Sequence, residues 1–145
     1  MPWRAKKRQR RVVVDTSVLV AGIRGFRDTY VPGRNPSADM LHQWAEKHSF
    51  TWLVSEDILE EYKEVLRRFS VRSSLIGKVV NLIRESGEEV RVRYSIEISP
   101  DPGDDPFCLC AEQGRANIIV TLNPKDFPQD RLQAMVILPE SLTAC

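Results

Sequence analysis

Short apolar runs alternate with longer amphipathic stretches along this chain. The runs at residues 12–14, 50–54, 117–122 and 134–138 are dominated by β-branched and other apolar side chains, which is typical of strands buried on both faces. Between them, residues 17–23, 37–47, 55–69, 73–86 and 107–114 carry apolar positions at helical spacing. Strands that alternate with helices predict an α/β fold, a three-layer α/β/α sandwich with a mainly parallel central sheet.

The segments between these elements give further predictions. Residues 89–93 alternate valine with charged residues, which predicts an exposed or edge strand. Residues 24–33 contain two glycines and a proline and are expected to form a loop after a short first helix. Ser73 or Ser74 is expected to cap the fourth helix, and Gly87 to end it.

The helix expected at 55–69 separates its glutamates by geometry. Its apolar stripe is centred near Tyr62, and at about 100° per residue Glu60 and Glu64 fall on the opposite, solvated face. Glu61 falls at the edge of the buried face. Of the three glutamates, only Glu61 is therefore expected to reach a site at the edge of the sheet.

Polar side chains follow two of the predicted strands directly. Asp15 comes after the run at 12–14, and Asn123 and Asp126 come after the run at 117–122. In open α/β sheets, ligands bind at the carboxyl ends of the strands. We expect these side chains to share that edge with Glu61.

An acidic cluster precedes the helix expected at 107–114. It consists of Asp101, Asp104 and Asp105, and Pro106 suits the first turn of that helix. Asp105 is then the natural N-cap, which leaves Asp104 free to join the other acids.

Several carboxylates at one edge predict a metal site. Like-charged carboxylates repel and raise one another's pKa, so a protein keeps them together mainly when a cation compensates. An all-oxygen site suits Mg²⁺ or Mn²⁺, and such ions activate water and stabilise charge on a phosphoryl group. The reaction class implied is hydrolysis of a phosphodiester or phosphate ester. Taken singly, an aspartate at a helix start is more often a cap than a ligand.

Composition narrows the class of protein. The chain has 145 residues, which fits one domain, and 42% of them are hydrophobic. Its three cysteines suit neither a disulfide framework nor a zinc site, so a cytoplasmic location is expected. The sequence contains no apolar run long enough to span a bilayer, and no membrane association is expected.

The charge is unevenly distributed. The first eleven residues carry six basic side chains and no acid, so a net charge of +1 leaves the remainder of the chain at −5. We expect residues 1–10 to form a basic, flexible arm on a single domain at residues 11–145. Such an arm either contacts phosphate backbones or is a solvated tail.

The order of the blocks VVVDTSVLV, SEDILEEYKEVL, DPGDDPF and IVTLNPKDF resembles a PIN domain. The resemblance extends over residues 11–138. A freestanding PIN domain of this kind resembles the VapC-type toxins of prokaryotic toxin–antitoxin pairs. It implies a metal-dependent endoribonuclease that hydrolyses RNA, forms a homodimer and is held inactive by a small antitoxin protein.

The resemblance also assigns roles to individual residues. It implies that the catalytic and metal-binding acids are Asp15, Glu61 and Asp104, with Asp105 the alternative for the third. Asn123 stands where the family has its fourth acid, which leaves open whether one or two metal ions bind.

Three residues are expected to support these acids. Asp126 could supply the missing carboxylate, directly or through water. Thr16 and Ser17 either contact a metal-bound water or substrate phosphate or, in the preferred interpretation, cap the first helix.

Two other functions fit parts of the sequence. A PIN-like module that binds nucleic acid or protein without cutting is favoured by Asn123 at an acidic position. A phosphohydrolase of the haloacid dehalogenase type also places an aspartate after a buried strand, but it needs a second one two residues later, where this chain has Ser17.

Overall fold

The protein is described by a computed structural model that covers residues 9–27 and 29–143. The first eight residues of the expected basic arm lie outside the described residues. Gln9 and Arg10 are held against the domain: the Gln9 side chain donates to His48 O, and Arg10 O accepts from Thr51 N.

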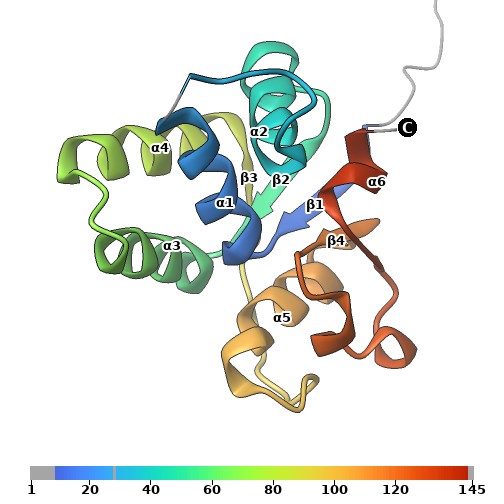
Figure 1. Ribbon diagram of the computed structural model, residues 1–145. Coiled ribbons are helices and arrows are strands. Elements are labelled where there is room, and N and C mark those ends of the chain that lie inside the picture. The colour runs from blue at the N-terminus through green and yellow to red at the C-terminus, as the bar shows by residue number, and fades with distance from the viewer. Residues whose placement is uncertain (1–8, 28, 144–145) are drawn as a thin grey trace, which may run out of the picture.

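A five-stranded, wholly parallel sheet forms the centre of the described part of the molecule (Figure 1). The strands are β1 (Arg11–Val14), β2 (Thr51–Val54), β3 (Glu88–Glu89), β4 (Ile118–Val120) and β5 (Met135–Ile137). Their order across the sheet is β3-β2-β1-β4-β5. The chain therefore moves outward from β1 to one edge and then returns to the other side of β1, and the order reverses between β1 and β4.

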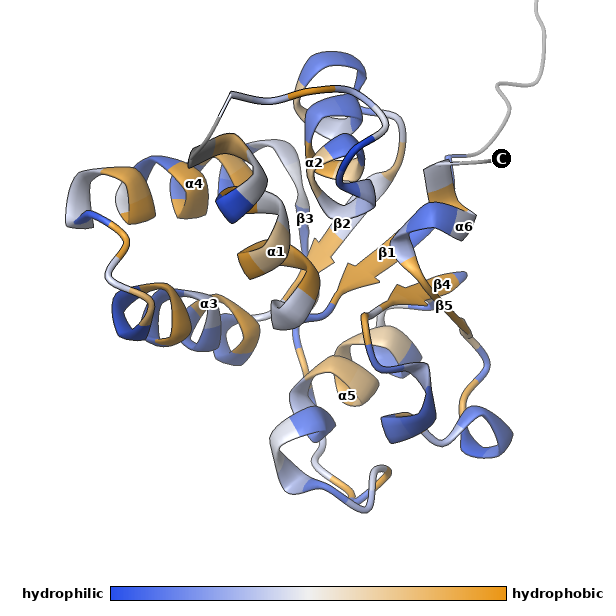
Figure 2. Ribbon diagram, viewed as in Figure 1, coloured by the Kyte–Doolittle hydropathy of each residue, from blue (hydrophilic) through white to orange (hydrophobic). Residues whose placement is uncertain are grey.

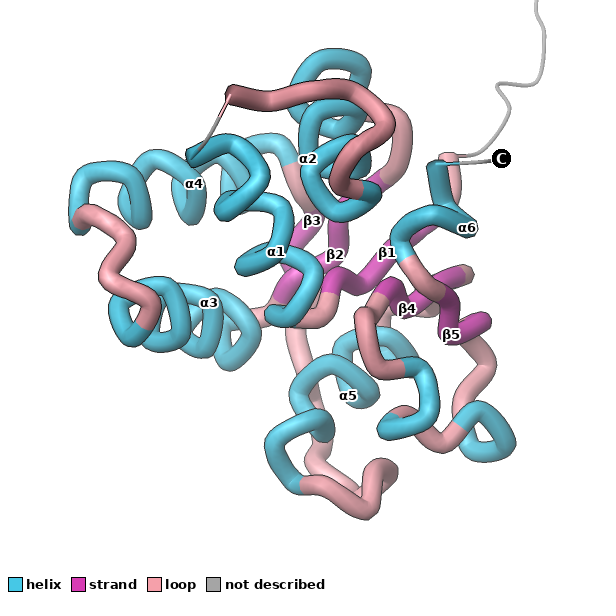
Figure 3. The backbone as a smooth tube through the Cα atoms, viewed as in Figure 1, coloured by secondary structure: helices cyan, strands magenta, loops and turns pink. Residues whose placement is uncertain are grey.

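Six α-helices surround the sheet within the described residues, as the tube view in Figure 3 shows. They are α1 (Thr16–Arg27), α2 (Pro36–Lys47), α3 (Glu56–Arg68), α4 (Ser73–Ser86), α5 (Asp105–Gln113) and α6 (Pro139–Thr143). Helix α1 packs on α2 and α3, while α5 packs on β1, β2 and β4 from the other side (Figure 1). The predicted α/β sandwich is confirmed.

Apolar residues concentrate between these layers (Figure 2). Val12, Val13 and Val14 are fully buried, as are Ile119 and Val120 in the neighbouring strand. The absence of a polar break in β1 therefore reflects helices on both faces of the sheet. None of the described helices is long and apolar enough to cross a membrane.

The first helix is longer than predicted. Residues 24–27 belong to α1 and not to a loop, and Gly25 lies within the helix. A Cβ on Gly25 would lie 2.7 Å from Ala38 Cβ, so the glycine allows α1 to approach α2 closely. The expectation of a break at this glycine was wrong because the residue serves helix packing.

Three other local predictions need correction. Neither Ser73 nor Ser74 caps α4, whose N-cap is Arg72 without a side-chain hydrogen bond, although Gly87 does end the helix. The edge strand is only two residues long because it pairs only with Leu53 and Val54. Helix α6 was not predicted, since five residues are too few to show helical spacing.

Candidate active site

The site lies where β1 and β4 end side by side. Asp15 follows β1, and its backbone N–H donates to Val120 O over 2.9 Å. This is the point at which the strand order reverses, which is the usual ligand position in open α/β sheets. The predicted edge is therefore the edge at which the structure places Asp15.

Three hydroxyl groups fix the two acids nearest this point. Ser17 Oγ and Thr121 Oγ1 both donate to Asp15 Oδ2, each over 2.7 Å. Thr16 Oγ1 donates to Glu61 Oε2 over 2.5 Å. The preferred interpretation of Thr16 and Ser17 as helix caps is wrong, because their hydroxyls hold carboxylates instead.

Glu61 reaches the site as its position on α3 predicted. It is half-buried, whereas Glu60 and Glu64 are exposed and pair with Lys63 and Arg68 on their own helix. Burial raises the pKa of Glu61, the Thr16 hydrogen bond lowers it, and the charge of Asp15 raises it.

Asp104 is the third carboxylate of the group. It ends a 3-10 turn at Pro102–Asp104 and makes no capping hydrogen bond to α5. Burial raises its pKa to about 6, with further contributions from the charges of Asp15, Asp101, Asp126 and Glu61. The acids predicted from four separate segments therefore interact electrostatically at one place.

Asp105 has a different role from its neighbour. It is the first residue of α5 and not its N-cap, so that prediction was wrong. Its Oδ1 accepts hydrogen bonds from Ile98 N over 3.1 Å and from Ser99 N over 2.8 Å. This carboxylate is committed to holding the preceding segment of the chain, which favours Asp104 as the acid of the site.

The segment after β4 completes the site. Asn123 is exposed, and its backbone N–H donates to Thr121 Oγ1 over 3.1 Å. Asp126 ends the 3-10 turn at Pro124–Asp126 and is near enough to Asp104 to raise its pKa. Asp126 thus supplies negative charge near the position where Asn123 lacks it.

Sequence reasoning missed Thr121 as a site residue. It is fully buried and bonds Asp15 directly. The signal was present, since a threonine that ends an apolar strand next to β1 is placed at the same edge as Asp15. Tyr62 was assigned only to the apolar stripe, yet its Oη donates to Val14 O, the residue before Asp15, over 2.5 Å.

The donor set fits a hard divalent cation in its chemistry. It consists of carboxylate and hydroxyl oxygens, which Mg²⁺ and Mn²⁺ prefer, and the charge of Asp15 raises the pKa of both Glu61 and Asp104. Among the described residues, however, no three acidic, histidine or cysteine side chains are grouped closely enough to hold an ion. The site therefore has the residue types of a metal centre, but among the described residues the carboxylates do not lie as close together as bound ligands of one ion would.

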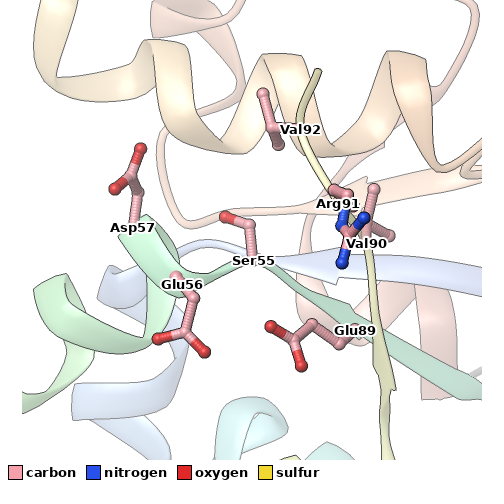
Figure 4. A pocket seen from close by; sticks show the side chains of 7 residues that line it. All are labelled: Ser55, Glu56, Asp57, Glu89, Val90, Arg91 and Val92. Atoms are coloured by element: carbon pink, nitrogen blue, oxygen red, sulfur yellow. The ribbon is translucent and has the colours of Figure 1, made fainter.

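A hollow of 560 Å³, separate from these acids, lies at the start of α3, beside β3 (Figure 4). Glu56, Asp57, Glu89 and Arg91 are among the residues that line it. Figure 4 shows Ser55 between Asp57 on one side and Arg91 on the other. Ser55 is occupied as the N-cap of α3. None of the predicted site residues lies here.

Comparison with protein families decides the classification. The model of the PIN domain matches residues 11–125 of this chain. The chain belongs to the PIN domain family. PIN domains are generally nucleases and typically use divalent metal ions. The matched residues include Asp15, Glu61 and Asp104. No curated protein matches the chain.

Proposed function

We propose that this PIN domain is a divalent-metal-dependent endoribonuclease that hydrolyses RNA phosphodiester bonds. The observation that carries the proposal is the position of Asp15 and Glu61 at the end of β1, where the hydroxyls of Ser17, Thr121 and Thr16 hold their carboxylates. Burial and the negative charge gathered there also raise the pKa of Asp104. Carboxylates that repel one another at a ligand-binding edge gain most from a bound cation. Membership of the PIN domain family supports the same reading.

Asp15, Glu61 and Asp104 would hold Mg²⁺ or Mn²⁺. When bound, such an ion lowers the pKa of a coordinated water and neutralises charge on the scissile phosphate. The hydroxyls of Ser17 and Thr121 orient the Asp15 carboxylate, and Thr16 orients Glu61. His42 lies in α2 beside Tyr30, and His48 is the C-cap of α2 beside Trp44. The acid–base groups of the proposed reaction are therefore the carboxylates.

The resemblance to VapC-type toxins extends the proposal to a biological role. We propose that the protein is the toxin of a toxin–antitoxin pair, acts in the cytoplasm as a homodimer and is inhibited by a small antitoxin protein. Induced expression of the wild type would then arrest bacterial growth, while the Asp15→Asn variant would not. Light scattering on the purified protein measures the oligomeric state.

Cleavage of a mixed RNA pool is the direct test of the nuclease. We expect cleavage by the wild type with Mg²⁺ or Mn²⁺, none with EDTA, and a loss of at least about 100-fold in Asp15→Asn. Asparagine has the shape of aspartate and retains an acceptor for the two hydroxyls, so circular dichroism should show an unchanged fold. The exposed Asp57→Asn is the matched control and should cut normally.

A module that binds RNA without cutting is the second candidate. It is favoured by Asn123 in place of an acid and by the lack of a closed three-carboxylate group among the described residues. RNA binding without cleavage under either metal, and no metal binding by calorimetry, would support this candidate against the nuclease.

A further inference from the structure

A groove that is lined by α1 and α3 leads away from the acidic site. It has a volume of 550 Å³ and begins at Thr16, Ser17 and Glu61. Ser17 connects the two regions, since its hydroxyl donates to Asp15 and accepts from the backbone N–H of Leu122 over 3.2 Å. The groove is therefore continuous with the site and not an isolated hollow.

The walls of the groove are apolar beyond the acids. Val20 and Val65 line it from α1 and α3, and Leu122, which is 41% exposed, lines it from the segment after β4. Phe69 lies at the far end and is also 41% exposed. Such a surface presents apolar area to a ligand that reaches the acids.

A planar, positively charged surface stands at that far end. The guanidinium carbon of Arg24 lies 4.5 Å from the centre of the Phe69 ring. Arginine and aromatic planes are the surfaces on which proteins stack unpaired bases. The pair thus offers one flat face beside the apolar walls.

A hollow of 390 Å³ adjoins the groove, and Arg24 and Asn35 line both. Tyr30 and Arg34 line this adjoining hollow. Within residues 9–27 and 29–143, no carboxylate forms an ion pair with Arg24 or Arg34. Arg68, by contrast, forms an ion pair with Glu64, which neutralises its charge.

We infer that this groove and the adjoining hollow bind a single strand of RNA on one side of the scissile phosphate. One unpaired base stacks at the Arg24–Phe69 pair, and the backbone phosphates lie next to Arg24 and Arg34. This inference rests on the proposed function, because it takes the acidic site as the point of cleavage. A duplex does not fit this description, since its bases are already stacked on one another.

The test is direct binding of RNA to protein that cannot cut. A labelled single-stranded oligonucleotide is titrated with the Asp15→Asn protein, and fluorescence anisotropy is followed between about 50 and 200 mM salt. Arg24→Ala and Arg34→Ala, added singly, should each weaken binding about threefold to tenfold. Each should also reduce the slope of log affinity against log salt by about 0.7, as expected for one lost phosphate contact.

Variants at Phe69 distinguish the contribution of base stacking to RNA binding from the contribution of charge. Phe69→Leu should weaken binding without changing the salt slope, because it removes a ring and no charge. Phe69→Tyr retains the ring and should bind as the parent does, which guards against a merely structural effect. Lys78→Ala removes an exposed charge from α4 and is the matched control; it should bind normally.

Two results would overturn the inference: unchanged binding in both arginine variants, or equally tight binding of a duplex of the same sequence. Its failure is distinguishable from that of the proposed function. Asp15-dependent cleavage with an unchanged KM in Arg24→Ala would retain the nuclease and reject the groove. Weaker binding by the arginine variants with no cleavage by the wild type would retain the groove and reject the nuclease.

Discussion

The hydroxyl of Thr16, the first residue of α1, donates a hydrogen bond of 2.5 Å to Glu61 Oε2 in the second turn of α3. The bond joins two helices that come from different parts of the chain. It also lowers the pKa of Glu61, which burial raises. The ionisation of Glu61 is thus set in part by α1, the helix that follows Asp15.

Removing this hydroxyl should raise the Glu61 pKa further. Thr16→Val preserves the shape of the side chain and removes the hydrogen bond that favours the ionised form. An NMR titration of the side-chain carboxyl groups measures the shift. Ser17→Ala is the control, because its hydroxyl bonds Asp15 and not Glu61. An unchanged Glu61 pKa in Thr16→Val would contradict the role given to this bond.

Asp104 should make the stability of the metal-free protein depend on pH. Its pKa is raised, mainly by burial, from 3.8 to about 6 in the folded protein, so ionising it costs folding free energy. Its contribution to stability is fully present below about pH 4 and is lost as pH rises through about 6. Asp104→Asn removes this cost. We expect it to raise the free energy of unfolding in EDTA by about 1 kcal/mol at about pH 7.5, after discounting for solvent screening.

Urea unfolding at about pH 4.5 and about pH 7.5 measures this effect. The gain in Asp104→Asn should be smaller at the lower pH, where the wild-type carboxyl is largely protonated. Asp57→Asn should show no such dependence. An equal gain at both pH values would show that charge on Asp104 is not its cause. Under the proposed function, Mg²⁺ affinity of the wild type should also rise over the same pH range.

Substitution of the adjacent Asp104 and Asp105 should have different effects on stability and on Mg²⁺ binding. Asp105→Ala leaves the backbone N–H groups of Ile98 and Ser99 without their acceptor, so we expect a loss of about 1–2 kcal/mol in stability. Amide hydrogen exchange should accelerate at these two positions. Asp104→Ala should leave both amides protected while weakening Mg²⁺ binding. The reverse pattern would make Asp105 the ligand.

Tyr62 should be important for stability through its hydroxyl alone. It is fully buried; Oη donates to Val14 O and accepts from Trp52 Nε1 over 3.3 Å. Tyr62→Phe leaves both partners buried and unpaired, which should cost about 2 kcal/mol in urea unfolding. Tyr94→Phe is the control, because Tyr94 is 57% exposed, and should change stability by less than about 0.5 kcal/mol. Similar values for the two variants would contradict the prediction.

Two helix glycines should respond to alanine with opposite signs. A Cβ on Gly22 would lie 2.9 Å from Leu41 Cγ and 3.0 Å from Ser37 O, so Gly22→Ala forces α1 and α2 apart. We expect it to lower stability by about 1–3 kcal/mol. Gly77 lies in α4 with open space where the Cβ would stand, and Gly77→Ala should raise stability by about 0.5–1 kcal/mol. Thermal unfolding of the two variants tests the sign of each.

The strands and the main helices could be predicted because their signals are local. Val12, Val13 and Val14 are apolar on both faces, and the stripe on α3 separates Glu61 from Glu60 without reference to any other element. The convergence of Asp15, Glu61 and Asp104 followed from one general property of parallel sheets. The sequence therefore predicts which strands and helices bring acids to the site.

Predictions failed where a residue's partner lies elsewhere in the chain. Gly25 has the sequence signal of a break, and only the neighbouring Ala38 explains why it lies inside α1. Asp105 has the signal of an N-cap, and only the return of Ile98 and Ser99 gives it another partner. The hydroxyls of Thr16 and Ser17 likewise suit a helix cap until Glu61 and Asp15 are placed beside them.

The order of strands across the sheet also constrains when the site can form during synthesis. Strand β4 lies next to β1 in space but is made after β1, β2 and β3. Thr121 and Asp126, which follow β4, leave the ribosome later than Asp15, Glu61 and Asp104. Asp15, Glu61 and Asp104 are all made before β4, the strand that brings Thr121 beside Asp15. Because a domain generally folds as a unit, the complete site on this topology forms only late in synthesis, after β4 has been made.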